Sequence, residues 1–223
     1  MSFWRAMLAI LVKDITVELR SRETFSAMLV FALLIAVVFS FALELRVDNA
    51  RQLAPGILWV AIAFSGVLGI NRSFLLEREG ACIEGLMLSP QDRSVIYVGK
   101  VLASVLFMLL AEAFLLPVLA VLFDVPILSP SLWVILLLGT LGLAVVGTLF
   151  AAMTVSTRAR DLMLPLLLFP VVVPVIIAAT KSTGLILDGR PLAEAFVWMR
   201  LMSAFDIVFM VIAVLGFEYV VEE

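Results

Sequence analysis

The sequence contains no histidine, and Cys82 is the only cysteine among its 223 residues. Without histidine the chain lacks the commonest metal ligand, the usual axial ligand of haem and the commonest general base. A single cysteine also excludes an internal disulfide, and Cys82 is read as a free reduced thiol. We therefore expect no metal site, no directly bound cofactor and no catalytic centre in this chain.

Charge is scarce as well. Charged residues make up 15% of the chain and hydrophobic residues 64%, and the formal net charge is −3. An acidic balance argues against a nucleic-acid partner, because binding to phosphates requires Lys and Arg. A soluble domain of this size could not cover so much apolar side chain, whereas lipid solvates it. The composition indicates a membrane protein.

Six long apolar runs follow the first 22 residues, each near the ~20 residues that a helix needs to cross a bilayer. They are Thr24–Leu43, Ala54–Ile70, Val98–Phe123, Leu132–Met153, Leu162–Thr180 and Leu201–Val221. None shows the strict alternation of a membrane β-strand. The predicted fold is all-α, with six transmembrane helices in a single domain over residues 1–223.

The N-terminal segment, residues 2–22, has the pattern of an amphipathic helix. The apolar residues that recur at helical spacing are Phe3, Trp4, Met7, Leu8, Leu11 and Ile15. The polar face is formed by Arg5, Lys13, Asp14, Glu18, Arg20 and Arg22. This pattern predicts a helix in the headgroup plane on the cytoplasmic side, acting at minimum as a membrane anchor.

The distribution of Lys and Arg predicts that both ends of the chain lie in the cytoplasm. With that orientation, ten of the 15 basic residues fall in cytoplasmic segments and five in external ones. The segment 71–97 becomes a cytoplasmic loop and 181–200 an external one. The external loop is long enough for a short surface helix, with Leu192, Phe196 and Met199 toward the membrane.

The cytoplasmic loop is the one long segment that cannot lie in lipid. Its charges surround an apolar block at Leu86–Leu88, and Pro90 would end a short helix there. We predict that this helix contacts a soluble partner; the alternative is a solvated loop with incidental apolar residues. The predicted contact residues are Glu77, Arg78, Glu79, Glu84, Leu86, Met87, Leu88 and Pro90.

Two features inside the spans are candidates for a pathway or gate. Glu112 lies in the middle of the third run, where an ionisable group costs ~2.5–3.5 kcal/mol and is expected to face the bundle interior or water. Pro165, Pro170 and Pro174 interrupt the backbone hydrogen bonds of the fifth run, as in the broken spans of transporters. The structural alternatives are a protonated or Ser/Thr-paired Glu112 and prolines that only shape helix packing.

Small residues predict close helix packing in two spans. Ser65 and Gly69 have small-xxx-small spacing in the second span. Gly139, Gly142 and Gly147 are expected to leave one side of the fourth span without bulky side chains.

The chain resembles the CcmB family, the permease subunits of the CcmAB transporter in cytochrome c maturation. The resemblance is carried by an ordered set of segments along nearly the whole chain. They are the opening Phe3-Trp4-Arg5, LAPGILWVA at Leu53–Ala61, EGACIEGLMLSP at Glu79–Pro90, LLLGTLGLAVVGTLFAAMTV at Leu136–Val155 and LPLLLFPVVVPVIIAAT at Leu164–Thr180. The outside loop and the acidic C-terminal end offer less to match.

The resemblance implies a six-span fold similar to the ABC-2 type exporters, in the bacterial inner membrane. The loop between spans two and three would then hold the coupling helix that docks on a separate ATPase, CcmA, which carries the ATP. Further partners would be CcmC, CcmD and the haem chaperone CcmE, besides lipid and a second permease copy. The cargo would be haem, or ATP hydrolysis would release haem-loaded CcmE from CcmC.

Three other readings stay open at the level of sequence. The first is an ABC-2 type exporter of another cargo, such as a lipid or a drug. The second is an integral-membrane enzyme, which would need clustered acids or histidines at a membrane face, whereas the charges here are scattered. The third is a passive scaffold without a conformational cycle.

Overall fold

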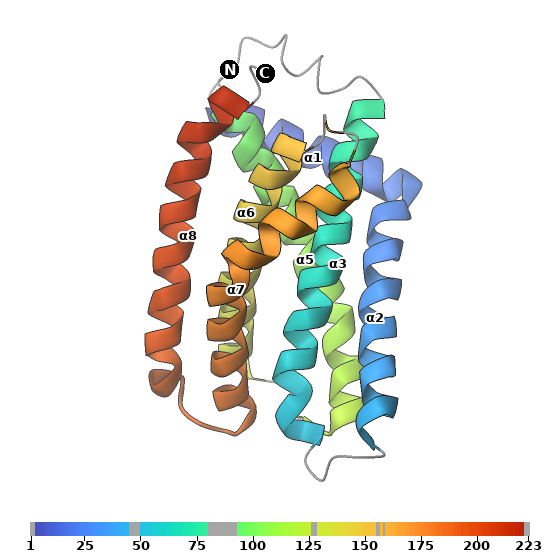
Figure 1. The fold of residues 1–223 in the computed structure, drawn as a ribbon, viewed down its shortest axis with the longest axis vertical. Helices are drawn as coiled ribbons and strands as arrows, with labels where there is room; N and C mark the ends of the chain where they lie inside the picture. The colour runs from blue at the N-terminus through green and yellow to red at the C-terminus, as the bar shows by residue number, and fades with distance from the viewer. Residues whose placement is uncertain are drawn as a thin grey trace.

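The computed structural model describes residues 3–44, 50–79, 93–125, 129–154, 157 and 159–220, and every regular element among them is a helix. The helices are α1 (Phe3–Ser21), α2 (Glu23–Glu44), α3 (Ala50–Glu79), α5 (Arg93–Phe123), α6 (Pro130–Thr154), α7 (Arg160–Leu187) and α8 (Leu192–Val220). The last six run lengthwise through the molecule, and α1 crosses one end of them (Figure 1).

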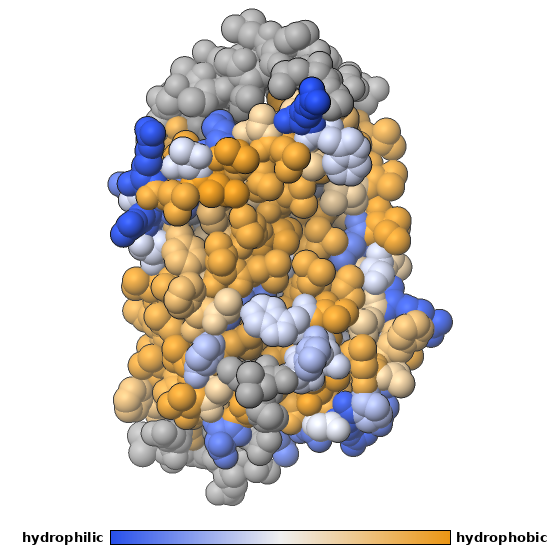
Figure 2. Space-filling view, turned by 180° about the vertical axis from the view of Figure 1, so that it is seen from behind, coloured by the Kyte–Doolittle hydropathy of each residue, from blue (hydrophilic) through white to orange (hydrophobic). Residues whose placement is uncertain are grey.

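The six predicted spans are confirmed, since six helices are long and apolar enough to cross a membrane. Their surfaces agree with this: exposed Val, Leu, Ile and Phe side chains cover the outside of the bundle. In Figure 2 a hydrophobic surface occupies most of the visible face, and hydrophilic residues gather toward its two ends. Helix α8 ends at the same end of the molecule as α1, as an even number of spans requires (Figure 1).

Helix α1 is the predicted amphipathic helix, but it has three sectors instead of two. The side chains buried against the bundle are Ala6, Met7, Ile10, Asp14 and Glu18. An exposed apolar stripe consists of Trp4, Leu8, Val12 and Leu19. Asp14 and Glu18, which the sequence assigned to the polar face with Lys13 and Arg20, are therefore separated from that face and buried. Both turn inward because each has a polar partner on another helix.

Helix α6 is the central span, and small residues let its neighbours approach. A Cβ on Gly139 would collide with the indole of Trp59 from α3, and one on Gly142 would meet Asp206 from α8. A Cβ on Gly147 would meet Ile70, again from α3. Gly139 and Gly147 therefore face α3, whereas Gly142 faces α8. This corrects the expectation that all three glycines lie on one side of the helix: α6 is enclosed by its neighbours, so it needs small residues on more than one side.

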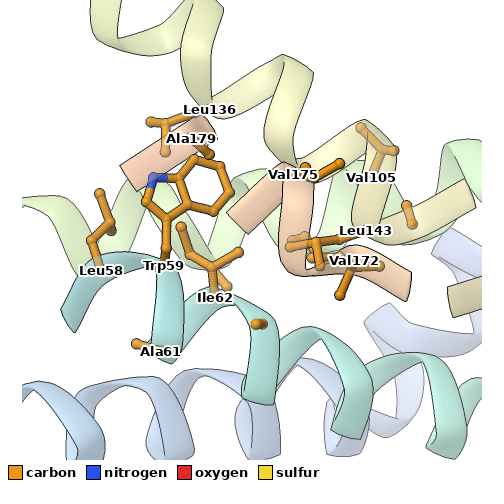
Figure 3. Close-up of a cluster of buried hydrophobic side chains, with 14 of the residues drawn as sticks. Leu58, Trp59, Ala61, Ile62, Val105, Leu136, Leu143, Val172, Val175 and Ala179 are labelled. Carbon is orange, nitrogen blue, oxygen red and sulfur yellow. The ribbon is translucent and has the colours of Figure 1, made fainter. Parts of the chain in front are cut away.

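The packing around Trp59 shows how α3, α6 and α7 form one core. Figure 3 places its indole beside Leu136 and Ala179, and Trp59 is fully buried. The indole Nε1–H donates a hydrogen bond to Thr183 Oγ1 of α7 at 2.9 Å. Since a buried indole N–H needs a partner, this contact fixes α3 against α7 as well as filling space.

The external loop 181–200 and its surface helix were predicted wrongly. Helix α7 continues to Leu187 and α8 begins at Leu192, so four residues connect them. The backbone N–H of Gly189 bonds to the carbonyl of Ile186 and that of Arg190 to Leu185, which is the Schellman arrangement. Gly189 adopts the left-handed φ of 76° that this motif needs. The charge of Lys181 did not end the span, because the buried Ile186 and Leu187 continue it.

The segment 71–97, predicted as a cytoplasmic loop, is helical at both of its ends. Helix α3 continues through Asn71 to Glu79, and α5 begins at Arg93, so residues 80–92 separate the two helices. The prediction ended the span where charges begin. A helix can leave the membrane without ending, because its backbone hydrogen bonds are internal.

Candidate functional site

The predicted partner-contact residues lie around the connection between α3 and α5. Glu77, Arg78 and Glu79 form the last turn of α3. The remaining candidates, Glu84, Leu86, Met87, Leu88 and Pro90, lie outside the described residues, so their contact role stays a prediction. The end of α3 and the start of α5 lie at the same end of the bundle as α1 (Figure 1). We call this end the α1 end.

The last turns of α3 are tied to the first turns of two other spans at the α1 end. Arg72 Nη2 lies 2.5 Å from Glu23 Oε2, at the start of α2. Asn71 Nδ2 donates a hydrogen bond to Asp161 Oδ1, at the start of α7, at 2.9 Å. A displacement of the end of α3 would therefore act directly on the ends of α2 and α7.

A buried ion pair links α5 to α1. Lys100 Nζ lies 2.9 Å from Asp14 Oδ2, and both side chains are less than a tenth exposed. Lys13 Nζ lies 3.1 Å from the other oxygen of the same carboxylate. Removing a charge from water costs several kcal/mol per ion, and the attraction between Lys100 and Asp14 offsets this cost only while both are present. The intact pair therefore holds α1 against α5. Sequence reasoning did not find it, because only the fold brings Asp14 to Lys100.

Glu18 fixes the junction between α1 and α2. Its Oε1 accepts a hydrogen bond from the backbone N–H of Phe25 at 2.7 Å. Phe25 lies in the first turn of α2, where the N–H groups have no partner within the helix. A carboxylate at this position is also favoured by the helix dipole. Together with the pair of Asp14 and Lys100, this contact attaches α1 to both α2 and α5.

Glu112 faces the bundle interior, as predicted. It is 1% exposed, and the hydroxyl of Thr140 on α6 donates a hydrogen bond to its Oε1. Residues of α2, α3 and α5, including Ser65 and Met108, surround it and leave no room for a water molecule. The geometry matches the Thr-paired structural alternative, and a pathway or gating role stays a prediction.

The three prolines lie within one continuous helix, α7. Figure 1 shows this helix changing direction along its length, as the missing N–H donors allow. Pro170 and Pro174 are exposed on the outside of α7 and Pro165 is half-buried. None of them is among the residues of α2, α3 and α5 that surround Glu112. The structure thus does not bring the two predicted pathway features together.

Asp206 is a buried acid that sequence reasoning missed. It lies in α8, is 5% exposed and stands next to Gly142 of α6 and Val175 of α7. Neither carboxyl oxygen has a hydrogen-bond partner among the described residues. The signal was present in the sequence as a lone acid inside the run LMSAFDIVFMVIA. With Glu112, it gives α6 one carboxyl-bearing neighbour in α5 and another in α8.

The opposite end of the bundle carries an exposed pair in the connection between α7 and α8. Arg190 Nη1 lies 2.9 Å from Glu194 Oε2. The hydrogen bond to Glu194, followed by that residue's negative charge, raises the pKa of Arg190 above its ordinary value. An arginine is a cation in any case, so this pair adds charge at the surface and little stability.

Comparison with known proteins identifies relatives over nearly the whole chain. The pattern of the CcmB family, described as CcmB protein, matches residues 5–222. A protein of Pseudomonas aeruginosa named Heme exporter protein B is 31% identical over 186 residues, which is 83% of each chain. The protein of that name from Rhodobacter capsulatus is 33% identical over 174 residues, 77% of this chain and 79% of its own. The one from Paracoccus denitrificans is 33% identical over 179 residues, 79% of this chain and 81% of its own.

Proposed function

Because this chain belongs to the CcmB family, we propose that it is the membrane permease subunit of an ABC complex that handles haem during cytochrome c maturation. The match over residues 5–222, together with six apolar spans, carries this proposal. The chain is a multi-pass protein of the bacterial inner membrane. The relatives' name, Heme exporter protein B, supports haem over a lipid or drug as the molecule concerned.

The ATPase of this complex is a separate chain of the CcmA type. The present sequence has no phosphate-binding loop: its Gly99-Lys100 pair is followed by Val101, where such a loop needs Ser or Thr. CcmC, CcmD and the haem chaperone CcmE are the proposed further partners. In this arrangement the chain performs no chemistry and transmits the effect of ATP binding and hydrolysis.

We place the contact with the ATPase at the connection between α3 and α5, residues 80–92. Two observations support this position. The helices on either side of the connection end at the α1 end. The same helices are linked to α1, α2 and α7 through Lys100, Arg72 and Asn71. The ATPase drives the bundle only if its two nucleotide states contact this connection differently.

Co-purification tests the contact directly. The chain is co-expressed with its ATPase. A double variant, Leu86→Asp and Met87→Asp, introduces two negative charges into the apolar block. We expect the ATPase to be lost from the purified complex, because a carboxylate cannot enter an apolar groove without a large desolvation cost. The conservative variant Leu86→Met with Met87→Leu should retain the ATPase. Unchanged co-purification of the aspartate variant, at a normal membrane level, would refute the contact.

A second experiment separates the two modes of haem handling. The full complex with CcmC, CcmD and haem-loaded CcmE is reconstituted in vesicles, and ATP is added on the ATPase side. Release of haem-loaded CcmE from CcmC without haem in the vesicle lumen assigns the chaperone-release mode. ATP-dependent haem in the lumen assigns export. If ATP produces neither while the ATPase is active and bound, the haem function itself is wrong, and a different cargo must be sought.

A further inference from the structure

A cavity of about 180 Å³ lies at the α1 end, among α1, α2, α3 and α5. Its α3 wall extends from Gly66 to Leu76 and its α5 wall from Lys100 to Met108. At 1.5 Å per residue these stretches correspond to about 15 and 12 Å along the helix axes. The cavity is therefore long and narrow, and it runs parallel to the spans.

The size of the cavity decides which class of molecule it can hold. Its 180 Å³ is the space of about six water molecules, and pockets for complete drug-sized ligands have about 300–1,000 Å³. A porphyrin is a broad plate and does not fit a slot of this kind. A single hydrocarbon chain is narrow enough to enter it, and a length of about 12–15 Å holds part of such a chain. Gly66 and Gly69 of α3 border the slot and let the side chains of Met108 and Met28 pack closely against that helix.

The two ends of the cavity differ in chemistry. Deep in the bundle it is bordered by Met28, Phe107 and Met108, which offer apolar surface. Near α1 it is bordered by Glu18 and by Lys13, whose ammonium lies 3.1 Å from Asp14 and whose side chain is 33% exposed. The exposed part of this ammonium can still contact a phosphate, and the apolar walls below it match a hydrocarbon tail.

The position of α1 sets the depth of this mouth in the membrane. Trp4, Leu8, Val12 and Leu19 form an exposed apolar stripe on α1, while Lys13 and Arg20 stand on a different side of the helix. A helix with this arrangement lies in the interfacial plane, with its apolar stripe among the acyl chains. The cavity beneath it then begins at the level of the lipid headgroups and extends into the acyl region of the same leaflet.

We propose that this cavity is a binding site for one glycerophospholipid of the leaflet at the α1 end, with an acyl chain in the slot and the phosphate at Lys13. The lipid joins α1 to α2, α3 and α5. It is thus a structural ligand of the part of the molecule that lies beside the connection between α3 and α5. The proposal concerns this chain alone, so it stands or falls independently of haem and of the ATPase.

Photo-crosslinking in nanodiscs tests the site. The full chain is reconstituted in phosphatidylethanolamine and phosphatidylglycerol with a small fraction of phosphatidylethanolamine that carries a diazirine midway along one acyl chain. Illumination should give adducts concentrated on the peptides around Gly69 and Met108. Filling the slot with Ala103→Leu should reduce these adducts about tenfold, and Ser104→Leu should reduce them less.

The matched control is Ala113→Leu, the same substitution on the exposed face of the same helix, which should leave the adducts unchanged. Lys13→Gln should lower the amount of phospholipid that stays bound in native mass spectrometry several-fold, while Lys181→Gln at the opposite end should not. Equal adduct yields in wild type and Ser104→Leu would overturn the proposal. So would a yield at Gly69 and Met108 no higher than on the exposed residues of α8, or a cavity occupied by detergent alone after lipid is supplied.

Discussion

The α1 end and the middle of the bundle are held together by different interactions. At the α1 end, five helices are joined by polar contacts between side chains, such as Lys100 with Asp14 and Arg72 with Glu23. In the middle, α6 is enclosed mainly by apolar side chains, apart from Glu112 and Asp206, and fits its neighbours through glycines at 139, 142 and 147. Polar contacts dominate the first region, and close packing dominates the second.

This difference bears on how movement can pass through the molecule. The exposed pair of Arg72 and Glu23 can exchange its partners for water at little cost, so it has alternative arrangements of similar free energy. A close-packed core has few, because small displacements cause collisions or voids. We infer that a push on the connection between α3 and α5 rearranges the polar contacts first and moves the packed spans as units.

The largest expected effect comes from the buried pair at the α1 end. Asp14→Asn removes the carboxylate charge next to Lys100 and should destabilise the chain by about 3–5 kcal/mol. The measurement is the thermal unfolding midpoint of the purified chain in detergent. Because Asp14→Asn removes the negative charge that lies 2.9 Å from the buried ammonium of Lys100, Asp14→Asn combined with Lys100→Met should recover a substantial part of the loss.

Arg190→Gln is the matched control, since it removes an exposed pair at the opposite end. Its unfolding midpoint should equal that of the wild type. If Asp14→Asn also left the midpoint unchanged, this pair would not hold the α1 end together. The claim that polar contacts stabilise this end would then be contradicted.

An intermediate effect is expected from overpacking the middle of the bundle. Gly139→Leu forces a side chain into the space of the Trp59 indole and should cost about 1–3 kcal/mol of stability. Gly216→Leu in α8 is the control, because a Cβ there meets no atom within 4 Å. Both variants are compared by thermal unfolding, and a similar response of the two would contradict the tight fit of α6 against α3.

The smallest effect concerns the hydrogen bond to Glu112. Thr140→Val removes the donor and keeps the shape, and interhelical hydrogen bonds in membranes contribute about 0.6 kcal/mol on average. Thr148→Val, on the same helix, should be neutral, since its hydroxyl has no hydrogen-bond partner among the described residues. Chemical unfolding in mixed micelles can resolve the pair. A loss of several kcal/mol for Thr140→Val would show that Glu112 depends on Thr140 far more than an ordinary contact.

The sequence predicted the spans well because long apolar runs have few other structures available to them in lipid. It misplaced their ends at Asn71 and Lys181, where a single charged or polar residue was read as the edge of a helix. Helices continue past such residues when later ones, such as Ile186 and Leu187, are again buried. The family assignment was also accessible, because its segments are ordered along nearly the whole chain.

The candidate site was less accessible from sequence. The partners of Lys100, Arg72 and Asn71 lie 86, 49 and 90 positions away in the chain, and nothing local indicates them. Glu112 was found because an acid within a span is rare, and Asp206 should have been found by the same reasoning. The slot beneath α1 depends on the arrangement of four helices, so no single stretch of sequence predicts it.

The most direct test of the account is the side of the membrane on which the connection between α3 and α5 lies. Cys82 belongs to this connection and is the only cysteine in the chain, so the unmodified protein can be labelled with a membrane-impermeant maleimide. We predict labelling in inverted inner-membrane vesicles and none in intact spheroplasts. Labelling in spheroplasts would place the connection away from the cytoplasm, where no ATPase could reach it, and would contradict the account.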